Sequence, residues 1–338
     1  MKCTDRAYLR RKKRKQQLRI RFICTFVIIG VITTAIFFLV GLHDVVKKYE
    51  SNAYKNSIYK AELFADSLCV TNEEVPFEEF YTHDEFPGAV VFNMDTQEVI
   101  FSQHANDKVY PASTTKIMTA YLALKYGDLS DTVMVSEKAV DIPSDSSTAW
   151  LEAGDRVKLE DLIYGLMLPS GNDSAIAIAE HISGSVDAFV ELMNEEANLL
   201  GATNTHYVNP HGYQDKEHYT TAYDLYLIFN ECLKDRTFVK VISSKNHIAK
   251  IVSKSGTTRE VTWGQSNQFL NGMREAPKGI RFVGGKTGNT FDAGSCLVIY
   301  GYDSSNTPYV SVVMGASSRR NLYDNMVFLW SAIEKIGK

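Results

Sequence analysis

Cysteine is scarce in this sequence, with five residues among 338. Cys3 and Cys24 lie near the N-terminus, and Cys69, Cys232 and Cys296 are spread over the rest of the chain. Three well-separated cysteines form at most one disulfide, and the sequence leaves open which pair that is. A disulfide framework is therefore excluded, and the fold depends on its hydrophobic core.

Repeats and low-complexity tracts are also absent, and two common hydrolase patterns are missing. The chain has no G-x-S-x-G elbow, which argues against a Ser-His-Asp hydrolase. It has no H-E-x-x-H pattern, and the spacing of His206, His211 and His218 gives a zinc peptidase little support. A composition of 45% hydrophobic and 22% charged residues is globular and excludes wholesale disorder.

Acidic residues are nearly missing from the first 21 residues, which contain ten Lys and Arg against one acid, Asp5. That segment carries a charge of +9, whereas the remaining chain, with 26 basic and 39 acidic residues, carries −13. The net charge of −4 is the sum of these two opposite parts. A basic nucleic-acid-binding domain is therefore excluded for the larger part, and we expect no nucleic-acid partner.

Residues 22–42 contain no ionisable side chain except the thiol of Cys24. As a helix, this segment spans roughly 30 Å, the thickness of the hydrocarbon core of a bilayer. We predict a retained transmembrane signal-anchor helix, with the basic tail 1–21 in the cytoplasm and the rest of the chain outside. A cleaved signal peptide is the rival, but the run is long for one and no A-x-A-like site follows.

The outer part divides into a stalk and a folded region. Residues 43–85 combine helical spacing with an acidic stretch and are predicted to be a stalk or linker, with dimerisation as the alternative. From residue 86 the patterns predict a hairpin around Asp95–Thr96, a helix after Pro111, helices over 159–200, strands after 245 and a C-terminal helix. Such an order indicates an α+β fold, in which an antiparallel sheet from both ends packs against a helical insertion.

Three short clusters in the folded region suggest chemistry when taken together. They are Ser113-Thr114-Thr115-Lys116, Ser170-Gly171-Asn172 and Lys286-Thr287-Gly288. A serine nucleophile needs a base, and a residue three positions along a helix lies on the same face, which places the Lys116 amine beside the Ser113 hydroxyl. Lysine acts as a base only if burial and a nearby cation, here Lys286, lower its pKa from about 10.4.

Each cluster alone has an ordinary structural interpretation. Ser113 fits a helix N-cap, the Ser170 cluster fits a turn, and the Lys286 cluster fits a glycine-rich bend. Their combination instead fits acyl transfer at a serine. A helix start aims backbone N–H groups at the reacting carbonyl, and Lys286 with Thr287 offers a charge and a hydroxyl to a substrate carboxylate.

The stretch from about residue 88 to 338 resembles the serine-type D-alanyl-D-alanine carboxypeptidases, the low-molecular-mass penicillin-binding proteins of peptidase family S11. The resemblance rests on PASTTKIMTA, LPSGNDSAIAIAEH, the segment ending in NPHGY, and GGKTGNTFDAGSC. It implies a penicillin-binding protein/β-lactamase-like α+β fold, in a catalytic domain of residues 86–338.

The resemblance also implies substrates, roles and location. Substrates would be peptidoglycan stem peptides ending in D-Ala-D-Ala, β-lactam antibiotics would be covalent inhibitors, and the enzyme would work outside a bacterial cell membrane without metal or cofactor. Ser113 would be the nucleophile and Lys116 its general base. The other implied roles are proton transfer and substrate holding by Ser170 and Asn172, substrate binding by Lys286, Thr287, Gly288 and Asn289, and an oxyanion hole from the N–H groups of Ser113 and Asn289.

Two rival functions and several departures accompany this prediction. A β-lactamase of the same fold is disfavoured because the chain lacks the E-x-x-L-N segment of class A enzymes, and a non-catalytic cell-wall-binding scaffold is the second rival. Asn289 stands where relatives often have histidine, and Gln97 stands where a turn glycine is usual. Arg319 or Arg320 is a further carboxylate-binding candidate, and Cys296 is expected to be a core residue.

Overall fold

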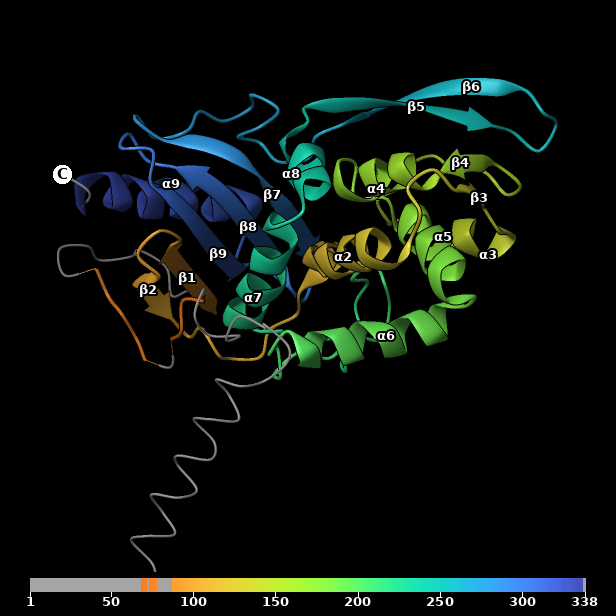
Figure 1. Ribbon diagram of the computed structural model, residues 1–338. Coiled ribbons are helices and arrows are strands. Elements are labelled where there is room, and N and C mark those ends of the chain that lie inside the picture. Colours follow the sequence, from red (N-terminus) through yellow and green to blue (C-terminus); the bar gives the residue numbers. More distant parts are fainter. Residues whose placement is uncertain (1–67, 72, 78–86, 337–338) are drawn as a thin grey trace, which may run out of the picture. The chain divides into compact units, whose positions relative to one another are not determined.

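The computed structural model describes residues 68–71, 73–77 and 87–336, which belong to one compact unit, Ala65–Lys338 (Figure 1). The predicted tail 1–21, the predicted transmembrane segment 22–42 and most of the predicted stalk 43–85 lie outside these residues. Within the described ranges, no helix combines the length and the hydrophobicity that crossing a bilayer requires.

A five-stranded antiparallel sheet is built from both ends of the described chain. Its strand order is β2 (Glu98–Gln103), β1 (Gly88–Asn93), β9 (Pro308–Ala316), β8 (Gly294–Tyr302) and β7 (Arg281–Thr290). The predicted hairpin is confirmed as β1 and β2, and its turn holds Gln97 at φ 60°. Gln97 thus occupies the left-handed conformation that glycine adopts most easily, which explains why glycine is usual there.

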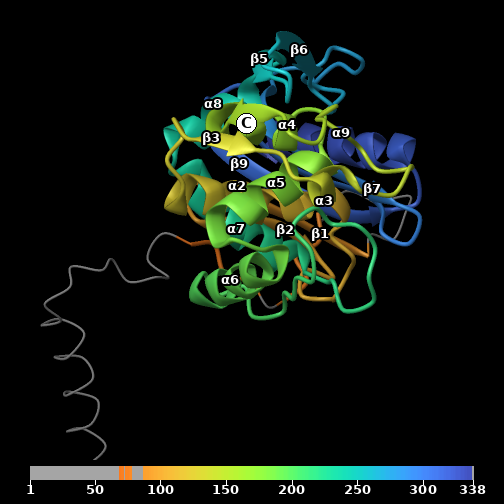
Figure 2. The same ribbon diagram turned by 90° about the vertical axis from the view of Figure 1, so that its right-hand side faces the viewer.

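Helices cover both faces of this sheet (Figure 2). Helix α9 (Arg319–Ile336) packs on β8 and β9 through the predicted apolar stripe, in which Leu322, Met326 and Trp330 are almost completely buried. The indole Nε1 of Trp330 donates a buried hydrogen bond to Ser311 Oγ on β9. The opposite face packs against α7 (Ala222–Leu233), so the sheet is a central layer between helices.

The middle of the chain forms the helical insertion that the sequence predicted. Beside α7 it contains η1 (Ala112–Thr115), α2 (Lys116–Tyr126), α3 (Glu137–Val140), α4 (Leu159–Met167), α5 (Asn172–Ser183), α6 (Val186–Leu199) and α8 (Arg236–Ser243). Several of these helices begin at a residue whose side chain accepts a backbone N–H bond, as Ser185 does for α6 and Thr221 for α7. These caps fix where the helices start in the sequence.

A second, four-stranded antiparallel sheet lies against the helical insertion. Its order is β3 (Thr132–Met134), β4 (Arg156–Lys158), β5 (Asn246–Val252) and β6 (Thr258–Gly264). The β5–β6 hairpin extends along α4 (Figure 1), and the side chain of Ile248 remains exposed there. The chain returns from β6 to β7 through residues 265–280, and this return brings Ser266 to the functional site described below.

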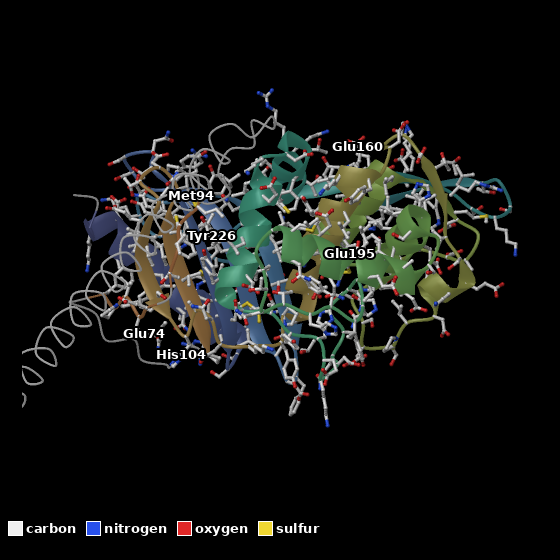
Figure 3. All side chains as sticks on the ribbon, turned by 60° about the horizontal axis from the view of Figure 1, so that its bottom comes forward. Glu74, Met94, His104, Glu160, Glu195 and Tyr226 are labelled. Carbon is white, nitrogen blue, oxygen red and sulfur yellow. The ribbon has the colours of Figure 1, made fainter. Side chains whose placement is uncertain are left out.

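Part of the predicted stalk contacts the folded region. Val75 and Ser102 exchange two backbone hydrogen bonds of 2.9 Å, and the Phe77 ring stacks on Phe101 at 5.0 Å. The carboxylate of Glu74 accepts a hydrogen bond from the backbone N–H of His104, and the two residues lie together in Figure 3. Residues 73–77 therefore pack along β2.

The cysteines of the described residues form no disulfide. Cys69, Cys232 and Cys296 are free and buried, and burial raises the pKa of the Cys296 thiol to about 11. Cys296 lies within β8, as expected for a core residue. The core of the described fold is thus hydrophobic and not cross-linked.

Candidate active site

Ser113 lies in the turn η1 that leads directly into helix α2. Lys116 is the first residue of α2, and its Nζ donates a hydrogen bond of 3.0 Å to Ser113 Oγ. The contact expected from the three-residue spacing is therefore present. The preceding residue, Ala112, has φ 48°, an uncommon conformation for a residue with a side chain.

Lys116 is completely buried and bonded to three oxygen atoms. Besides Ser113, its Nζ donates to Asn172 Oδ1 at 2.7 Å and to the backbone carbonyl of His211 at 2.7 Å. These three oxygen partners fix the position of the amine. Burial lowers the pKa of Lys116 well below its ordinary value, and the charge of Lys286 lowers it further.

Lys286 approaches the same region from strand β7. Its Nζ donates to Ser170 Oγ at 3.0 Å and to the backbone carbonyl of Thr287 at 2.9 Å. Its side chain is buried as well, and burial lowers the pKa of Lys286 to about 7. Ser170 is held at φ 67°, so the loop before α5 is fixed in a left-handed turn that points its hydroxyl at Lys286.

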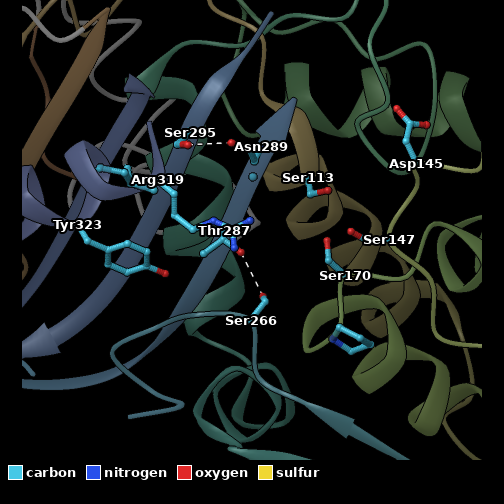
Figure 4. Close-up of a pocket in the computed structure, with 13 residues that line it drawn as sticks. Ser113, Asp145, Ser147, Ser170, Ser266, Thr287, Asn289, Ser295, Arg319 and Tyr323 are labelled. Atoms are coloured by element: carbon cyan, nitrogen blue, oxygen red, sulfur yellow. Dashed lines mark hydrogen bonds between the residues drawn. The ribbon is translucent and has the colours of Figure 1, made fainter. Parts of the chain in front are cut away.

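These residues form two walls of a groove, which we name for their structure. The helical wall comprises residues 111–116 and 170–172, and the strand wall comprises residues 286–289 of β7. Figure 4 shows Ser113 and Ser170 facing Thr287 and Asn289 across the groove. Ser113 borders two adjoining cavities, of about 270 Å³ and about 440 Å³, so its side chain lies where they meet.

The smaller cavity is lined by hydroxyl groups and one arginine. Thr287 Oγ1 lies 3.1 Å from Ser266 Oγ, and Arg319 at the start of α9 lines the same cavity. Arg320, in contrast, is strongly exposed and pairs with Asp324. Of the two candidates for carboxylate binding, Arg319 is thus the one in the groove.

The two walls touch where glycine is required. A Cβ on Gly288 would lie 2.9 Å from the Pro111 carbonyl oxygen and 3.0 Å from the Ser113 nitrogen. Glycine therefore allows β7 to pass against the nucleophile turn. Asn289 follows at the groove, where Ser295 Oγ donates to its Oδ1 at 2.8 Å.

Some residues at the site were not identified from the sequence. Asp173 is buried, and its carboxylate accepts hydrogen bonds from the backbone N–H groups of Ala149 and Leu151. This anchors the loop that carries Ser147 and Asp145 into the groove. The position of Asp173 directly after the Ser170 cluster could have identified it from the sequence. Ser266 has no such local signal, because only the tertiary fold brings it to the groove.

The histidines considered for zinc from the sequence each have partners of their own. His211 Nδ1 accepts from the N–H of Tyr213, and burial lowers the pKa of His211 to about 3. His206 Nδ1 contacts the Glu217 carbonyl, and His218 is described below. Across the part of the chain that the structure describes, no three His, Cys, Asp or Glu side chains are grouped so as to hold a metal ion.

Comparison with known proteins agrees with the motifs. The profile of peptidase family S11, D-alanyl-D-alanine carboxypeptidase, matches residues 85–318. The D-alanyl-D-alanine carboxypeptidase DacF of Bacillus subtilis is 32% identical over 239 residues, which are 69% of this chain and 58% of that protein. The D-alanyl-D-alanine carboxypeptidase of Streptomyces sp. strain K15 is 34% identical over 241 residues, which are 68% of this chain and 81% of that protein.

A solved structure supports the fold. The crystal structure of the Streptomyces K15 DD-transpeptidase matches with a TM-score of 0.69 at 29% identity, covering 75% of this chain and 98% of that one. The predicted penicillin-binding protein-like α+β fold is thereby confirmed. The chain spans less than two thirds of the length of DacF, but the family profile extends over well more than half of the chain. The chain therefore belongs to the D-alanyl-D-alanine carboxypeptidase family, peptidase S11.

Proposed function

We propose that this protein removes the terminal D-alanine from peptidoglycan stem peptides ending in D-Ala-D-Ala, through an acyl-Ser113 intermediate. The observation that carries the proposal is the contact of a fully buried Lys116 amine with Ser113 Oγ. Burial lowers the pKa of Lys116, which favours the neutral amine that a general base requires. Family membership agrees with this chemistry.

The proposed reaction has two steps. In the first, Ser113 Oγ bonds to the carbonyl carbon before the terminal D-alanine, and its proton passes to Lys116. The C–N bond then breaks, and the proton leaves with the D-alanine amine, with the Ser170 hydroxyl in the relay and Asn172 holding Lys116. In the second step, water attacks the ester, which restores the Ser113 hydroxyl and releases the shortened peptide as a carboxylate.

The strand wall is proposed to bind the substrate. Thr287 and, at the start of α9, Arg319 line the smaller cavity, and Lys286 contacts Ser170 in its lining. A hydroxyl and two charges are therefore offered to the terminal carboxylate. The backbone N–H groups of Ser113 and Asn289 are proposed to stabilise the oxyanion. Close contact of Gly288 with the Ser113 nitrogen supports that pairing, because it brings the two chain segments together.

Membrane attachment and domain organisation are further parts of the proposal. The basic tail 1–21 and the apolar run 22–42 support a single-pass anchor with the catalytic region 86–338 on the cell-wall side. Residues 43–85 would be the linker, part of which packs on β2. Binding of β-lactams at Ser113 is proposed from the family membership.

Two assays on the same preparation test the function. Wild-type protein is expected to be labelled covalently by a fluorescent penicillin and to release D-alanine from a pentapeptide, and Ser113→Ala is expected to do neither. Undiminished labelling of Ser113→Ala would overturn the mechanism. Labelling without D-alanine release would favour the scaffold, and rapid turnover of penicillin would favour the β-lactamase.

A further inference from the structure

The segment between His206 and Tyr219 contacts the turn that carries Ser113. Its ends pair through two backbone hydrogen bonds, of 2.8 and 3.0 Å, so the segment is a closed excursion. Its His211 carbonyl accepts from Lys116, as described above. At Gly212, which has φ 86°, a Cβ would lie only 1.8 Å from the Ala112 carbonyl oxygen. The segment therefore presses directly on the residue before Ser113.

His218 makes a second connection from this segment to the same carbonyl. The backbone N–H of Val208 donates to His218 Nδ1 at 3.0 Å, so Nδ1 has no proton in the neutral ring. The proton then resides on Nε2, which lies 2.8 Å from Thr115 Oγ1 and donates to it. Thr115 Oγ1 in turn donates to the Ala112 carbonyl at 2.8 Å. Each of these three hydrogen bonds thus has a defined donor and acceptor.

This series of hydrogen bonds ends at Ala112, the strained residue of the turn that carries Ser113. Ala112 has φ 48°, a conformation that residues with a side chain seldom adopt unless their surroundings impose it. The carbonyl of Ala112 belongs to the peptide whose N–H is that of Ser113. Fixing this carbonyl therefore fixes the direction of the Ser113 N–H and the start of the Ser113 side chain.

We propose that His218 is a positioning residue, which acts through Thr115 to hold the Ala112–Ser113 peptide in the orientation needed for acylation. The inference rests on the proposed acyl-Ser113 chemistry. His218 is 2% exposed and does not line either cavity of the groove, so we assign it no direct part in proton transfer. The prediction concerns the acylation step, with little effect on carboxylate binding at Thr287.

Two substitutions of His218 separate its two hydrogen bonds. Glutamine places an N–H donor near the position of Nε2 and retains the bond to Thr115, whereas asparagine reaches only the position of Nδ1 and retains the bond from Val208. We expect His218→Gln to acylate within about threefold of wild type and His218→Asn to be slower by roughly 10- to 100-fold. If His218 had only a structural role, the acylation rates of both variants would instead fall in proportion to their loss of thermal stability.

Substitutions of Thr115 test the same series of hydrogen bonds at the residue that follows His218 in it. Thr115→Val keeps the shape but removes the hydroxyl, and we expect an acylation rate lower by roughly 10- to 100-fold, with kcat for D-alanine release falling more than KM changes. Thr115→Ser is expected to restore most of the rate. His206→Asn, on the same segment but not linked to Thr115, is the matched control and should acylate normally.

The double variant Thr115→Val/His218→Asn decides whether the two residues act together. All proteins are full-length, and acylation by a fluorescent penicillin is measured well below the thermal midpoint of each. We expect the double variant to acylate no more slowly than the slower single variant, because each substitution interrupts the same series of hydrogen bonds to the Ala112 carbonyl. If the two substitutions instead lowered the acylation rate by the product of their single effects, this inference alone would be overturned. The same holds if wild type is active and Thr115→Val acylates at the wild-type rate. An unreactive wild type would overturn the proposed function and the inference with it.

Discussion

The two walls of the groove each contribute a buried lysine, and the two lysines are held in different ways. Lys116 of the helical wall is three residues from Ser113 and donates to three oxygen atoms, two of them from distant parts of the chain. Lys286 of the strand wall donates to Ser170 across the groove and to its neighbour Thr287. The proposed nucleophile and base thus lie in one turn of the helical wall, whereas the position of the strand wall depends on assembly of the whole sheet.

This difference suggests that the helical wall serves mainly the reaction and the strand wall mainly substrate binding. Burial lowers the pKa of both lysines, and the charge of Lys286 lowers that of Lys116 further. The strand wall therefore also tunes the base of the helical wall. Substitutions in the helical wall are expected to affect acylation, and those in the strand wall are expected to affect substrate binding more.

The largest effect is expected from removal of the base. Lys116→Ala should lower the acylation rate by about 10²- to 10⁴-fold, because no other group takes the Ser113 proton. Stopped-flow measurement with a reporter penicillin checks this, and the exposed Lys138→Ala is the matched control. A near-normal rate for Lys116→Ala would mean that another base is used.

The contact between the walls can be broken at Gly288. Gly288→Ala adds a Cβ that would lie 2.9 Å from the Pro111 carbonyl oxygen, so β7 must move away from the nucleophile turn. We expect acylation to slow by about 10²-fold while the thermal midpoint changes little. An unchanged acylation rate would show that the two walls need not touch for catalysis.

The pH dependence distinguishes the two lysines. In the proposed mechanism Lys116 works as the neutral amine, so acylation should increase as pH rises through its lowered pKa. Lys286 is proposed to bind the substrate carboxylate as the cation, and its pKa of about 7 means that the charge is lost as pH rises above that value. KM for a pentapeptide should therefore increase above about pH 7.

Lys286→Arg, which keeps its charge, should remove this alkaline rise in KM. A pentapeptide whose terminal carboxylate is replaced by an amide is the control, since its KM should not depend on the charge of Lys286. A rise in KM that persists in Lys286→Arg would assign the titration to another group.

The smallest effect is expected at the hydroxyl of the strand wall. Thr287→Val removes one donor to the proposed carboxylate site and should raise KM about tenfold, with a smaller change in kcat. Thr287→Ser should restore the wild-type KM, and steady-state release of D-alanine measures both constants. A loss confined to kcat would place Thr287 in the reaction and not in recognition.

The sequence predicted the helical wall better than its surroundings. The Ser113–Lys116 contact follows from helical spacing, and the sheet of both chain ends follows from strand patterns at both ends. The Thr115–His218 bond joins residues 103 positions apart, and Ser266 reaches Thr287 from the β6–β7 return. Such contacts depend on how separate elements pack, and no local pattern in a single sequence records them.

The central claim is that Ser113 is the residue that becomes acylated, and peptide mapping tests it most directly. Trypsin cleavage after Lys108 and Lys116 releases residues 109–116, VYPASTTK, in which Ser113 is the one serine. After reaction of the full-length protein with penicillin, mass spectrometry should find the whole mass of the antibiotic on this peptide. An adduct on the peptide that contains Ser170, or no adduct on any peptide, would contradict the account.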